Sequence, residues 1–454
     1  MRNPMFVYDE QLTNLILDYC RWRLALDPVP LDFGGAQASS LDASLRGLIN
    51  AGGTDAHRVM EVFDKELATA VVSCDSPRFL SFIPAAPTKA ALLFDMVVAC
   101  SSLQGTSWME AAGAVAAENQ ALGVLAGLAD LPAGAGGCFV SGGSAGNLSA
   151  LMVARDTAAH RLGGRSPRRP LIAVSEEAHS SVGKALSVLG VEALRVPCED
   201  HRLTGATLSS AIERHPRGAD AIGVVATGGT TNAGIIDDLA GVGEVARRRS
   251  LWFHVDGAYG CAALFAPSVR DRFDGIEMVD SLVVDPHKWL FAPFDCAALI
   301  YREPNLAKAV HTQDASYLDV LHRDAPEEWN PSDYAYHLTR RARGLPLWFS
   351  LAVNGTDAYR DAVETVLAVT RQTADLIEAL PRLDLVRRPE LSVVLFRRNG
   401  WDRDDYEKWS ARLLEDQIGF VMPTTWEDEP VCRLALLHPD TTVEMIGEIL
   451  ATMA

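Results

Sequence analysis

The order of apolar and polar positions divides the chain into three stretches. Apolar residues recur with helical spacing at 8–27 and 55–72, and residues 88–128 predict two further helices. Between about 136 and 300, short and nearly continuous apolar runs alternate with helical stretches. Beyond 345, a long helical pattern precedes shorter strands and helices. The pattern therefore predicts leading helices, a large α/β unit and a smaller α+β unit.

The middle stretch contains seven apolar runs that predict buried strands. Near-continuous apolar strands joined by helical crossovers are typical of a mostly parallel sheet that is covered on both faces. Ligands of such sheets bind beyond the carboxyl ends of the strands, so reactive side chains should gather there. The predicted strands are 137–140, 171–174, 193–196, 221–226, 251–255, 281–284 and 297–301.

The expected domain boundaries fall near residues 75 and 345. Residues 1–75 form a helical segment that should pack on a partner subunit, 76–345 a large domain, and 346–454 a small α+β domain. The small domain is predicted to contain helices 345–380, 409–417 and 443–453 and strands 383–386, 391–397 and 431–437.

Composition narrows the classes of partner. The 454 residues are 48% apolar and carry a net charge of −18 without a basic block, which disfavours nucleic acid and anionic membranes as partners. Asp9 and Glu10 interrupt any signal-peptide core, and no apolar run reaches membrane-spanning length. The eight cysteines are scattered without a Cys-x-x-Cys pair, so we expect reduced thiols in a cytoplasmic protein and no metal site.

Lys288 follows the predicted strand 281–284 in a turn. Pro286 ends the strand because proline cannot donate a ladder hydrogen bond, which leaves His287 and Lys288 at the mouth of the sheet. A partly dehydrated lysine can serve as a nucleophile or Schiff-base partner. Taken alone, such a lysine is more often an ordinary surface residue.

A glycine-rich segment, 141–147, follows the first strand and opens a helix predicted over 148–160. Its glycines let the backbone approach an anion, the helix N-terminus offers free N–H groups, and Ser144 adds a hydroxyl. It lacks the Gly-Lys-Ser/Thr ending of a nucleotide P-loop and departs from the dinucleotide fingerprint. A nicotinamide-type oxidoreductase is therefore a disfavoured alternative, and a phosphate cradle is the favoured interpretation.

Three other strand ends carry polar residues. His179 can stack on a flat ligand or act as an acid or base, or it can cap the next helix. The small, hydroxyl-rich residues 227–234 allow close approach of a ligand, although an ordinary loop would look similar. Asp256, at the tip of a buried strand, needs a donor or cationic partner, either within the core or on a protonated ring nitrogen.

A phosphate cradle, a buried aspartate and a lysine at successive strand ends match the needs of pyridoxal 5′-phosphate. The cradle would anchor the phosphate, Asp256 would keep the pyridine nitrogen protonated, and Lys288 would bind the cofactor covalently. His179 is available for the exposed face of the ring. A non-catalytic protein of the same fold would be expected to lack Lys288 or Asp256, and both are present.

With these motifs the chain resembles the group II pyridoxal-phosphate-dependent decarboxylases, which include aromatic-L-amino-acid and glutamate decarboxylases. The resemblance covers roughly residues 77–440, and Asp-x-His-Lys-Trp at 285–289 is its most specific element. Supporting motifs are Ser-Gly-Gly-Ser at 141–144, Ala-His-Ser-Ser-Val at 178–182, Gly-Thr-Thr at 229–231, His-Val-Asp-x-Ala-Tyr at 254–259, Phe-Asp-Cys at 294–296 and Arg-Arg-x-Arg at 340–343.

The resemblance implies a fold, an assembly and residue roles. The fold would be α/β, of the aspartate-aminotransferase-like type I, in a homodimer with active sites at the interface. Gly143 and Ser144 would hold the phosphate, and Tyr317, on a mobile loop, would return a proton after carbon dioxide leaves. A packed aromatic residue beside a turn is the alternative for Tyr317. The residues implied to line the cofactor are Thr230, Ala258, Asp285 and His287, besides His179, Asp256 and Lys288.

The implied reaction is decarboxylation of an L-amino acid to an amine, and aldehyde formation or another lyase reaction is the alternative. Family members that form aldehydes commonly lack the tyrosine or the histidine, and both Tyr317 and His179 are present. Departures from the family pattern at 112–116, Ala85 and Gly257 leave the substrate open. The aromatic segment 79–83 and Trp108 favour an aromatic or apolar side chain.

Overall fold

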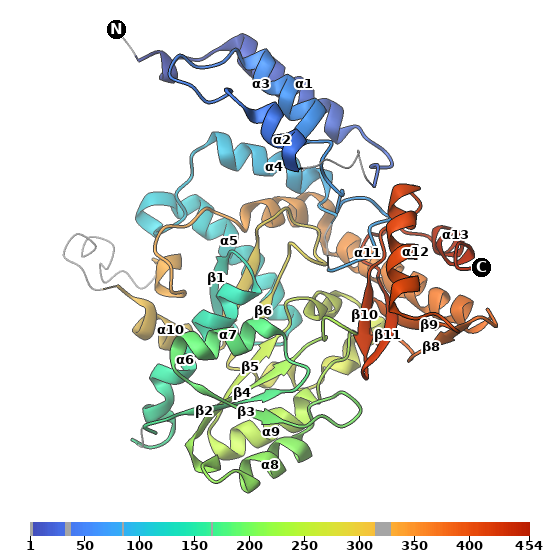
Figure 1. The fold of residues 1–454 in the computed structure, drawn as a ribbon. Coiled ribbons are helices and arrows are strands. Elements are labelled where there is room, and N and C mark those ends of the chain that lie inside the picture. Colours follow the sequence, from blue (N-terminus) through green and yellow to red (C-terminus); the bar gives the residue numbers. More distant parts are fainter. Residues whose placement is uncertain (1–2, 32–37, 84–85, 165–166, 314–327) are drawn as a thin grey trace.

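The computed structural model describes residues 3–31, 38–83, 86–164, 167–313 and 328–454 (Figure 1). Seven strands form one central sheet in the order β1-β7-β6-β5-β4-β2-β3. The strand pairs are parallel except where β7 lies antiparallel between β1 and β6, so the predicted mostly parallel α/β sheet is confirmed. The strands are β1 Gly136–Val140, β2 Leu171–Ser175, β3 Glu192–Val196, β4 Ala221–Thr227, β5 Trp252–Asp256, β6 Ser281–Val284 and β7 Ala297–Tyr301.

Helices bury both faces of this sheet, as the continuous apolar strands require. One apolar cluster joins the sheet to α6 (Gly143–Arg161), α7 (Ser180–Leu189) and α10 (Pro304–His311). The other joins it to α5 (Trp108–Leu128), α8 (Gly205–Arg214) and α9 (Leu239–Arg249), and short 3₁₀ turns replace a helix between β5 and β6. Helix α6 begins at Gly143 rather than at the expected residue 148, so the glycine-rich segment forms its first turn.

The leading helices are α1 (Glu10–Leu24), α2 (Ala38–Leu45), α3 (Ala56–Val62) and α4 (Lys89–Cys100). Figure 1 shows the first three gathered at one end of the molecule, beyond α4. Helix α1 buries none of its residues, and Leu12, Ile16 and Trp22 are exposed. An amphipathic helix gains its stability by burying its apolar face, and α1 leaves that face uncovered in the single chain. None of the described helices has the length and apolar content needed to cross a membrane.

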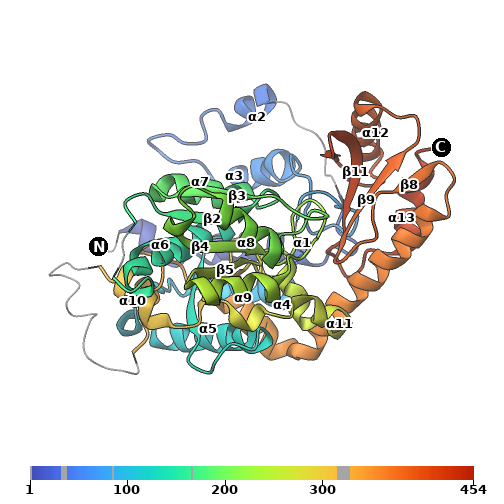
Figure 2. The same cartoon turned by 90° about the horizontal axis from the view of Figure 1, so that it is seen from below.

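A second sheet of four antiparallel strands, in the order β10-β11-β9-β8, follows the long helix α11 (Leu345–Glu378). Figure 2 shows α11 running from beneath the large sheet to the small one. The strands are β8 Leu383–Leu385, β9 Val393–Arg398, β10 Pro423–Trp426 and β11 Glu429–Ala435, and the helices are α12 Arg403–Glu415 and α13 Val443–Ala451. The sequence pattern did not predict β10, because this short strand begins with proline and has no apolar alternation.

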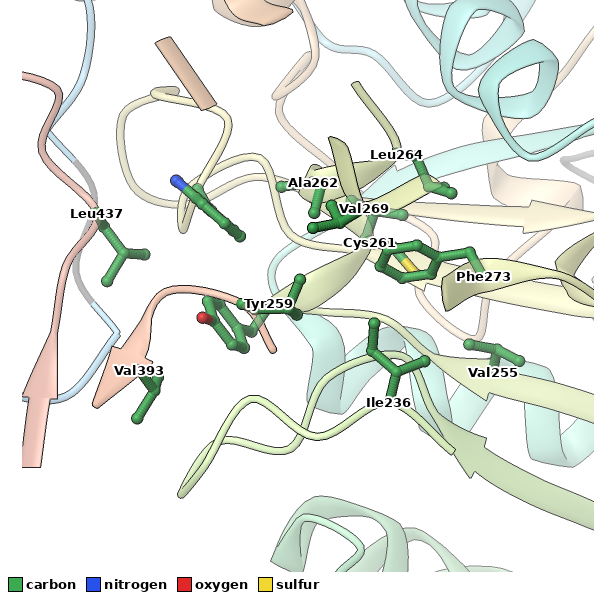
Figure 3. Packing of buried hydrophobic residues seen from close by; sticks show 14 of the residues in the cluster. Ile236, Val255, Tyr259, Cys261, Ala262, Leu264, Val269, Phe273, Val393 and Leu437 are labelled. Carbon is green, nitrogen blue, oxygen red and sulfur yellow. The ribbon is translucent and has the colours of Figure 1, made fainter. Parts of the chain in front are cut away.

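The turn after β5 is packed against both sheets (Figure 3). Val255, Cys261 and Phe273 belong to the large core, and Tyr259 lies on the side of Val393 at the start of β9. The Tyr259 hydroxyl lies 2.5 Å from Ser392 Oγ, and the Tyr259 ring stacks on Trp289 at a centroid distance of 5.6 Å. The segment that follows Asp256 is therefore held from two sides.

Candidate active site

A cavity of about 310 Å³ lies at the carboxyl ends of the parallel strands. Segments that follow β1, β2, β4, β5 and β6 all contribute to its wall. This convergence follows from topology, because parallel strands end at the same edge of a sheet. The predicted site residues that line it are Gly143, Ser144, His179, Asp256, Ala258, Asp285, His287 and Lys288.

Two predicted site residues stand apart from this group. Thr230 does not line the cavity: its hydroxyl accepts the Ile235 N–H at 3.1 Å inside its own loop, and its neighbours Gly229 and Thr231 line the wall instead. The Gly-Thr-Thr segment thus reaches the cavity through its first and third residues, and the residue types alone do not reveal which of the two threonines lines it. Tyr317 lies outside the described residues, as does Ala85.

The glycine-rich segment brings backbone N–H groups to one end of the cavity. Gly143, the first residue of α6, donates its N–H to Asp285 Oδ2 at 3.1 Å. A Cβ at this position would lie 3.0 Å from the Ala258 Cβ and 3.1 Å from Asp285 Oδ2, so the close packing favours glycine. With the Ser144 hydroxyl and the positive end of the α6 dipole, this corner can hold an anion.

Lys288 contacts the same carboxylate oxygen of Asp285 as the Gly143 N–H does. Its Nζ is 3.0 Å from Asp285 Oδ2, and its side chain is 24% exposed whereas that of Asp285 is 2% exposed. Trp289 and Leu290 are fully buried behind it, so the turn is rigidly packed. Burial lowers the pKa of the neighbouring His287, whose Nδ1 lies 2.7 Å from the Cys296 carbonyl oxygen. The amine is thus held at the cavity wall by a carboxylate and remains accessible.

Asp256 is held by neutral donors. Its Oδ1 accepts the Ala258 N–H at 3.2 Å, and its Oδ2 accepts Asn147 Nδ2 at 2.8 Å. Asn147 also reaches Ser181 Oγ at 3.1 Å, and that hydroxyl lies 2.8 Å from His179 Nδ1. Asn147 and Ser181 are not among the predicted site residues, although both line the cavity. Residue type gave no signal here, because the predicted helix began at residue 148 and asparagine is common just before a helix; only the observed start of α6 at Gly143 puts Asn147 inside the helix.

The comparison with known families decides the class of this site. The chain matches the model of the pyridoxal-dependent decarboxylase conserved domain over residues 49–399, which is more than half of its length. The chain belongs to this family. The resemblance deduced from the motifs is therefore confirmed, and the protein is a pyridoxal-phosphate-dependent amino-acid decarboxylase.

Individual relatives agree with this assignment. The chain is 28% identical over 410 residues to the aromatic-L-amino-acid decarboxylase of Bacillus atrophaeus, covering 88% of this chain and 85% of the relative. It is 30% identical over 373 residues to the L-2,4-diaminobutyrate decarboxylase of Rhizobium meliloti, covering 79% and 74% of the two chains. The crystal structure of Oryza sativa TDC with PLP and tryptamine has a TM-score of 0.90 at 24% identity, over 100% of this chain and 99% of that one. The predicted type I fold is thereby confirmed.

The cavity of this decarboxylase fits its cofactor, pyridoxal 5′-phosphate. Thr227 Oγ1 and Asp285 Oδ1 are buried, belong to residues of the cavity wall and have no hydrogen-bond partner among the described residues. An orphaned buried polar atom is costly, and a polar ligand would satisfy both. The anion corner, the Asp256 carboxylate and the Lys288 amine are of the chemical types that would suit the phosphate, ring nitrogen and carbonyl carbon of the cofactor.

Proposed function

We propose that this decarboxylase removes carbon dioxide from an L-amino acid with an aromatic or apolar side chain and releases the corresponding amine. The proposal depends on one observation above all: Lys288, Asp256 and the Gly143–Ser144 corner face a single cavity. Bound there, pyridoxal 5′-phosphate supplies the electron sink for the bond that breaks. The chain must hold the cofactor, orient the substrate carboxylate and return one proton.

We assign the residue roles as follows. Lys288 binds the cofactor covalently, and Asp256 pairs with its ring nitrogen. His179 covers one face of the ring. Gly143 and Ser144 hold the phosphate, with Ala258, Asp285 and His287 around the ring. Thr231, which lines the cavity, takes the place that we predicted for Thr230. The return of the proton by Tyr317 stays a prediction.

The preference for an aromatic or apolar substrate is supported by a cluster of three rings beside the cavity. Phe79 and Phe82 each pack on Phe420, at centroid distances of 4.9 and 6.0 Å. Arg433 ties this cluster to the cavity wall, because it donates to the Phe82 carbonyl at 2.9 Å and to the Thr231 carbonyl at 2.6 Å. Trp108 does not line the cavity, so this residue no longer supports the preference.

We also propose a homodimer with shared active sites and the domain boundaries near residues 75 and 345. The uncovered apolar face of α1 supports a partner subunit, and Leu93 and Val97 on α4 are both about half exposed. Helix α11 begins at Leu345 and leads into the second sheet, which supports the second boundary. Analytical ultracentrifugation of the wild type and of the double variant Leu93→Glu/Val97→Glu tests the dimer. Two charges buried in the proposed interface should shift the equilibrium toward monomer.

The central test compares the visible absorbance of the cofactor-loaded wild type with that of Lys288→Ala. The wild type should show the absorbance of a lysine-bound cofactor and release carbon dioxide from aromatic or apolar amino acids, whereas the variant should lose the band and all activity. Lys184→Ala, which removes an exposed lysine on α7, is the control and should behave as the wild type. The proposal fails if Lys288→Ala keeps the band.

The substrate and product need separate assays. A panel of amino acids scored for carbon dioxide release tests the side-chain preference, and release from basic or acidic amino acids alone would refute it. Product analysis with oxygen consumption distinguishes an amine from an aldehyde. We expect amine without oxygen uptake.

A further inference from the structure

The carboxylate that faces the cofactor is the end of a buried chain of hydrogen bonds that leads away from the cavity. Trp252, His254 and Asp256 are alternate residues of β5, so their side chains lie on the same face of the sheet. Helix α6 packs on that face and contributes Asn147. The first residue of β6, Ser281, is paired in register with His254. Five polar side chains from three elements thus meet in a region that excludes water.

The contacts between these side chains form one continuous path. Trp252 Nε1 lies 2.8 Å from Ser281 Oγ, which lies 2.8 Å from His254 Nδ1. His254 Nε2 lies 2.9 Å from Asn147 Oδ1, and Asn147 Nδ2 lies 2.8 Å from Asp256 Oδ2. The first four side chains are at most 1% exposed. In such surroundings each donor needs an acceptor, so each hydrogen bond along the path has a defined donor and a defined acceptor.

The chemistry at the two ends determines these donors and acceptors. The Asp256 carboxylate can only accept, so Asn147 donates to it through Nδ2 and leaves Oδ1 as the acceptor for His254 Nε2. The Trp252 indole can only donate, so Ser281 Oγ accepts from it, and with a neutral His254 protonated on Nε2 the Ser281 hydroxyl donates to His254 Nδ1. His254 then carries its proton on Nε2 and donates it to Asn147 Oδ1. This arrangement requires a neutral imidazole, and burial lowers the pKa of His254 to about 4, against the opposing influence of Asp256. The Asn147 amide is thereby oriented with its NH₂ group toward Asp256.

The same amide reaches the residue that covers the cofactor ring. The second N–H of Asn147 donates to Ser181 Oγ, and the Ser181 hydroxyl donates to His179 Nδ1. The Ser181 N–H also points to this nitrogen at 3.3 Å. His179 therefore carries its proton on Nε2, and its ring is linked to Asp256 through two side chains, Ser181 and Asn147.

We infer that Asn147 is a positioning residue that holds Asp256 and His179 in register with the bound cofactor, and that Trp252, Ser281 and His254 orient its amide. This inference rests on the roles proposed above for Asp256 and His179. Asn147 presents a neutral donor, so it fixes the carboxylate without cancelling its charge. A lysine or arginine at the same place would compete with the protonated ring nitrogen for that charge.

The first experiment measures the dissociation constant of pyridoxal 5′-phosphate for the full-length protein by titration of the visible absorbance. Asn147→Ala should weaken binding by about 10- to 100-fold, the range expected for losing a hydrogen bond to a charged group. In an Asp256→Asn background the same substitution should change binding by less than about threefold, because coupled residues are not additive. An equal loss in both backgrounds would show a merely structural role and overturn the inference.

A matched pair at His254 tests the relay without touching Asn147. Leucine and glutamine have similar size, but only glutamine can present an N–H to Asn147 Oδ1. His254→Leu should weaken cofactor binding by about 3- to 10-fold, and His254→Gln should stay within about threefold of the wild type. Equal losses in the two variants would refute the relay, and this pair also decides the matter if Asn147→Ala does not fold.

The control on α6 is Thr157→Val. Thr157 is also buried, but its hydroxyl bonds to the Val153 carbonyl of its own helix at 2.7 Å, away from the cavity. Thr157→Val should lower the stability of the protein without changing the dissociation constant of pyridoxal 5′-phosphate. A change in that constant as large as the one caused by Asn147→Ala would overturn the inference. If Asp256→Asn itself leaves binding and activity unchanged, the proposed function of Asp256 fails; if it weakens both while Asn147→Ala is silent, only the inference fails.

Discussion

Glu118 and Asp256 are both buried carboxylates, and they differ in the partners that surround them. Glu118, on α5, forms an ion pair with Arg340 at 2.8 Å, in which the side chains are 2% and 0% exposed. Its Oε1 also accepts the Gly344 N–H at 2.8 Å. Asp256 is bonded to the Asn147 amide and the Ala258 N–H, and the nearby cation of Lys288 pairs with Asp285 instead.

The difference distinguishes a structural charge, that of Glu118, from the charge of Asp256, for which we propose a functional role. The charge of Glu118 is cancelled inside the protein, so breaking its pair leaves an isolated charge in the core. The charge of Asp256 is oriented but not cancelled, and it faces a cavity. An uncompensated buried carboxylate is costly, and binding a protonated ring nitrogen offsets that cost. In the role that we propose for Asp256, this uncompensated charge would favour binding of the protonated ring nitrogen of the cofactor.

The largest expected effect comes from neutralising the functional charge. Asp256→Asn should lower kcat by about 10²- to 10³-fold, because a preorganised electrostatic contact to the reacting system is lost. The free energy of unfolding of the cofactor-free protein should change by no more than about 1–2 kcal/mol. The only new unfavourable contact is that an N–H of the introduced amide would face another hydrogen-bond donor. Steady-state kinetics and urea unfolding of one preparation measure both. A stability loss with unchanged kcat would reverse the comparison.

Breaking the Glu118–Arg340 ion pair should lower stability strongly and leave cofactor binding unchanged. Arg340→Met leaves the buried Glu118 carboxylate without its cationic partner and the Gly105 carbonyl oxygen without the Arg340 donor, and should cost about 3–5 kcal/mol of stability. The fraction that remains folded should bind the cofactor as the wild type does, because neither residue lines the cavity. The double variant Glu118→Leu/Arg340→Met is the control and should recover most of the lost stability in urea unfolding.

The smallest effect is expected at His201, a partly exposed histidine whose contacts join the loop after β3 to the small sheet. His201 lies 2.9 Å from Glu177 Oε1 and 3.0 Å from Glu427 Oε1, and its ring packs on Trp426. Burial alone would lower the pKa of His201, but the hydrogen bonds that the ring donates to the two carboxylates outweigh burial and raise the pKa. The protonated form therefore stabilises the fold.

This link has a defined pH dependence. A histidine whose pKa is raised on folding contributes fully below its unfolded pKa of about 6.5, and the contribution is lost as the pH rises through the folded pKa. His201→Gln should cost about 0.5–1 kcal/mol at pH 6 and little at pH 9. Thermal unfolding of the two proteins across this range measures the difference, and a cost that is independent of pH would contradict it.

Much of the fold was predictable because it depends on local burial. Each of the seven predicted strands of the large sheet begins and ends within one residue of the observed strand, since continuous apolar runs between turn residues report burial directly. The strand order was not predictable. Strand β7 returns between β1 and β6 because of long-range hydrogen bonds, which leave no mark on the local pattern.

Gly257, where the family commonly has alanine, is a second feature whose reason only the tertiary structure supplies. A Cβ there would lie 2.1 Å from the Cys261 Sγ, so the thiol of this chain occupies the space that an alanine would need. The sequence showed that the family's common alanine is absent, and only the packing supplies the reason. Thr230 is a similar case, because loop geometry rather than residue type turned its hydroxyl away from the cavity.

By itself, the sequence determined the α/β class, the cofactor and the strand ends where the chemistry gathers, because residue type and spacing carry that information. The tertiary structure alone decided how these groups are oriented. It brought Asn147, His254 and Ser281 from three elements into one water-free path to Asp256. Orientation depends on donors and acceptors that are far apart in the chain, so no local pattern could reveal it.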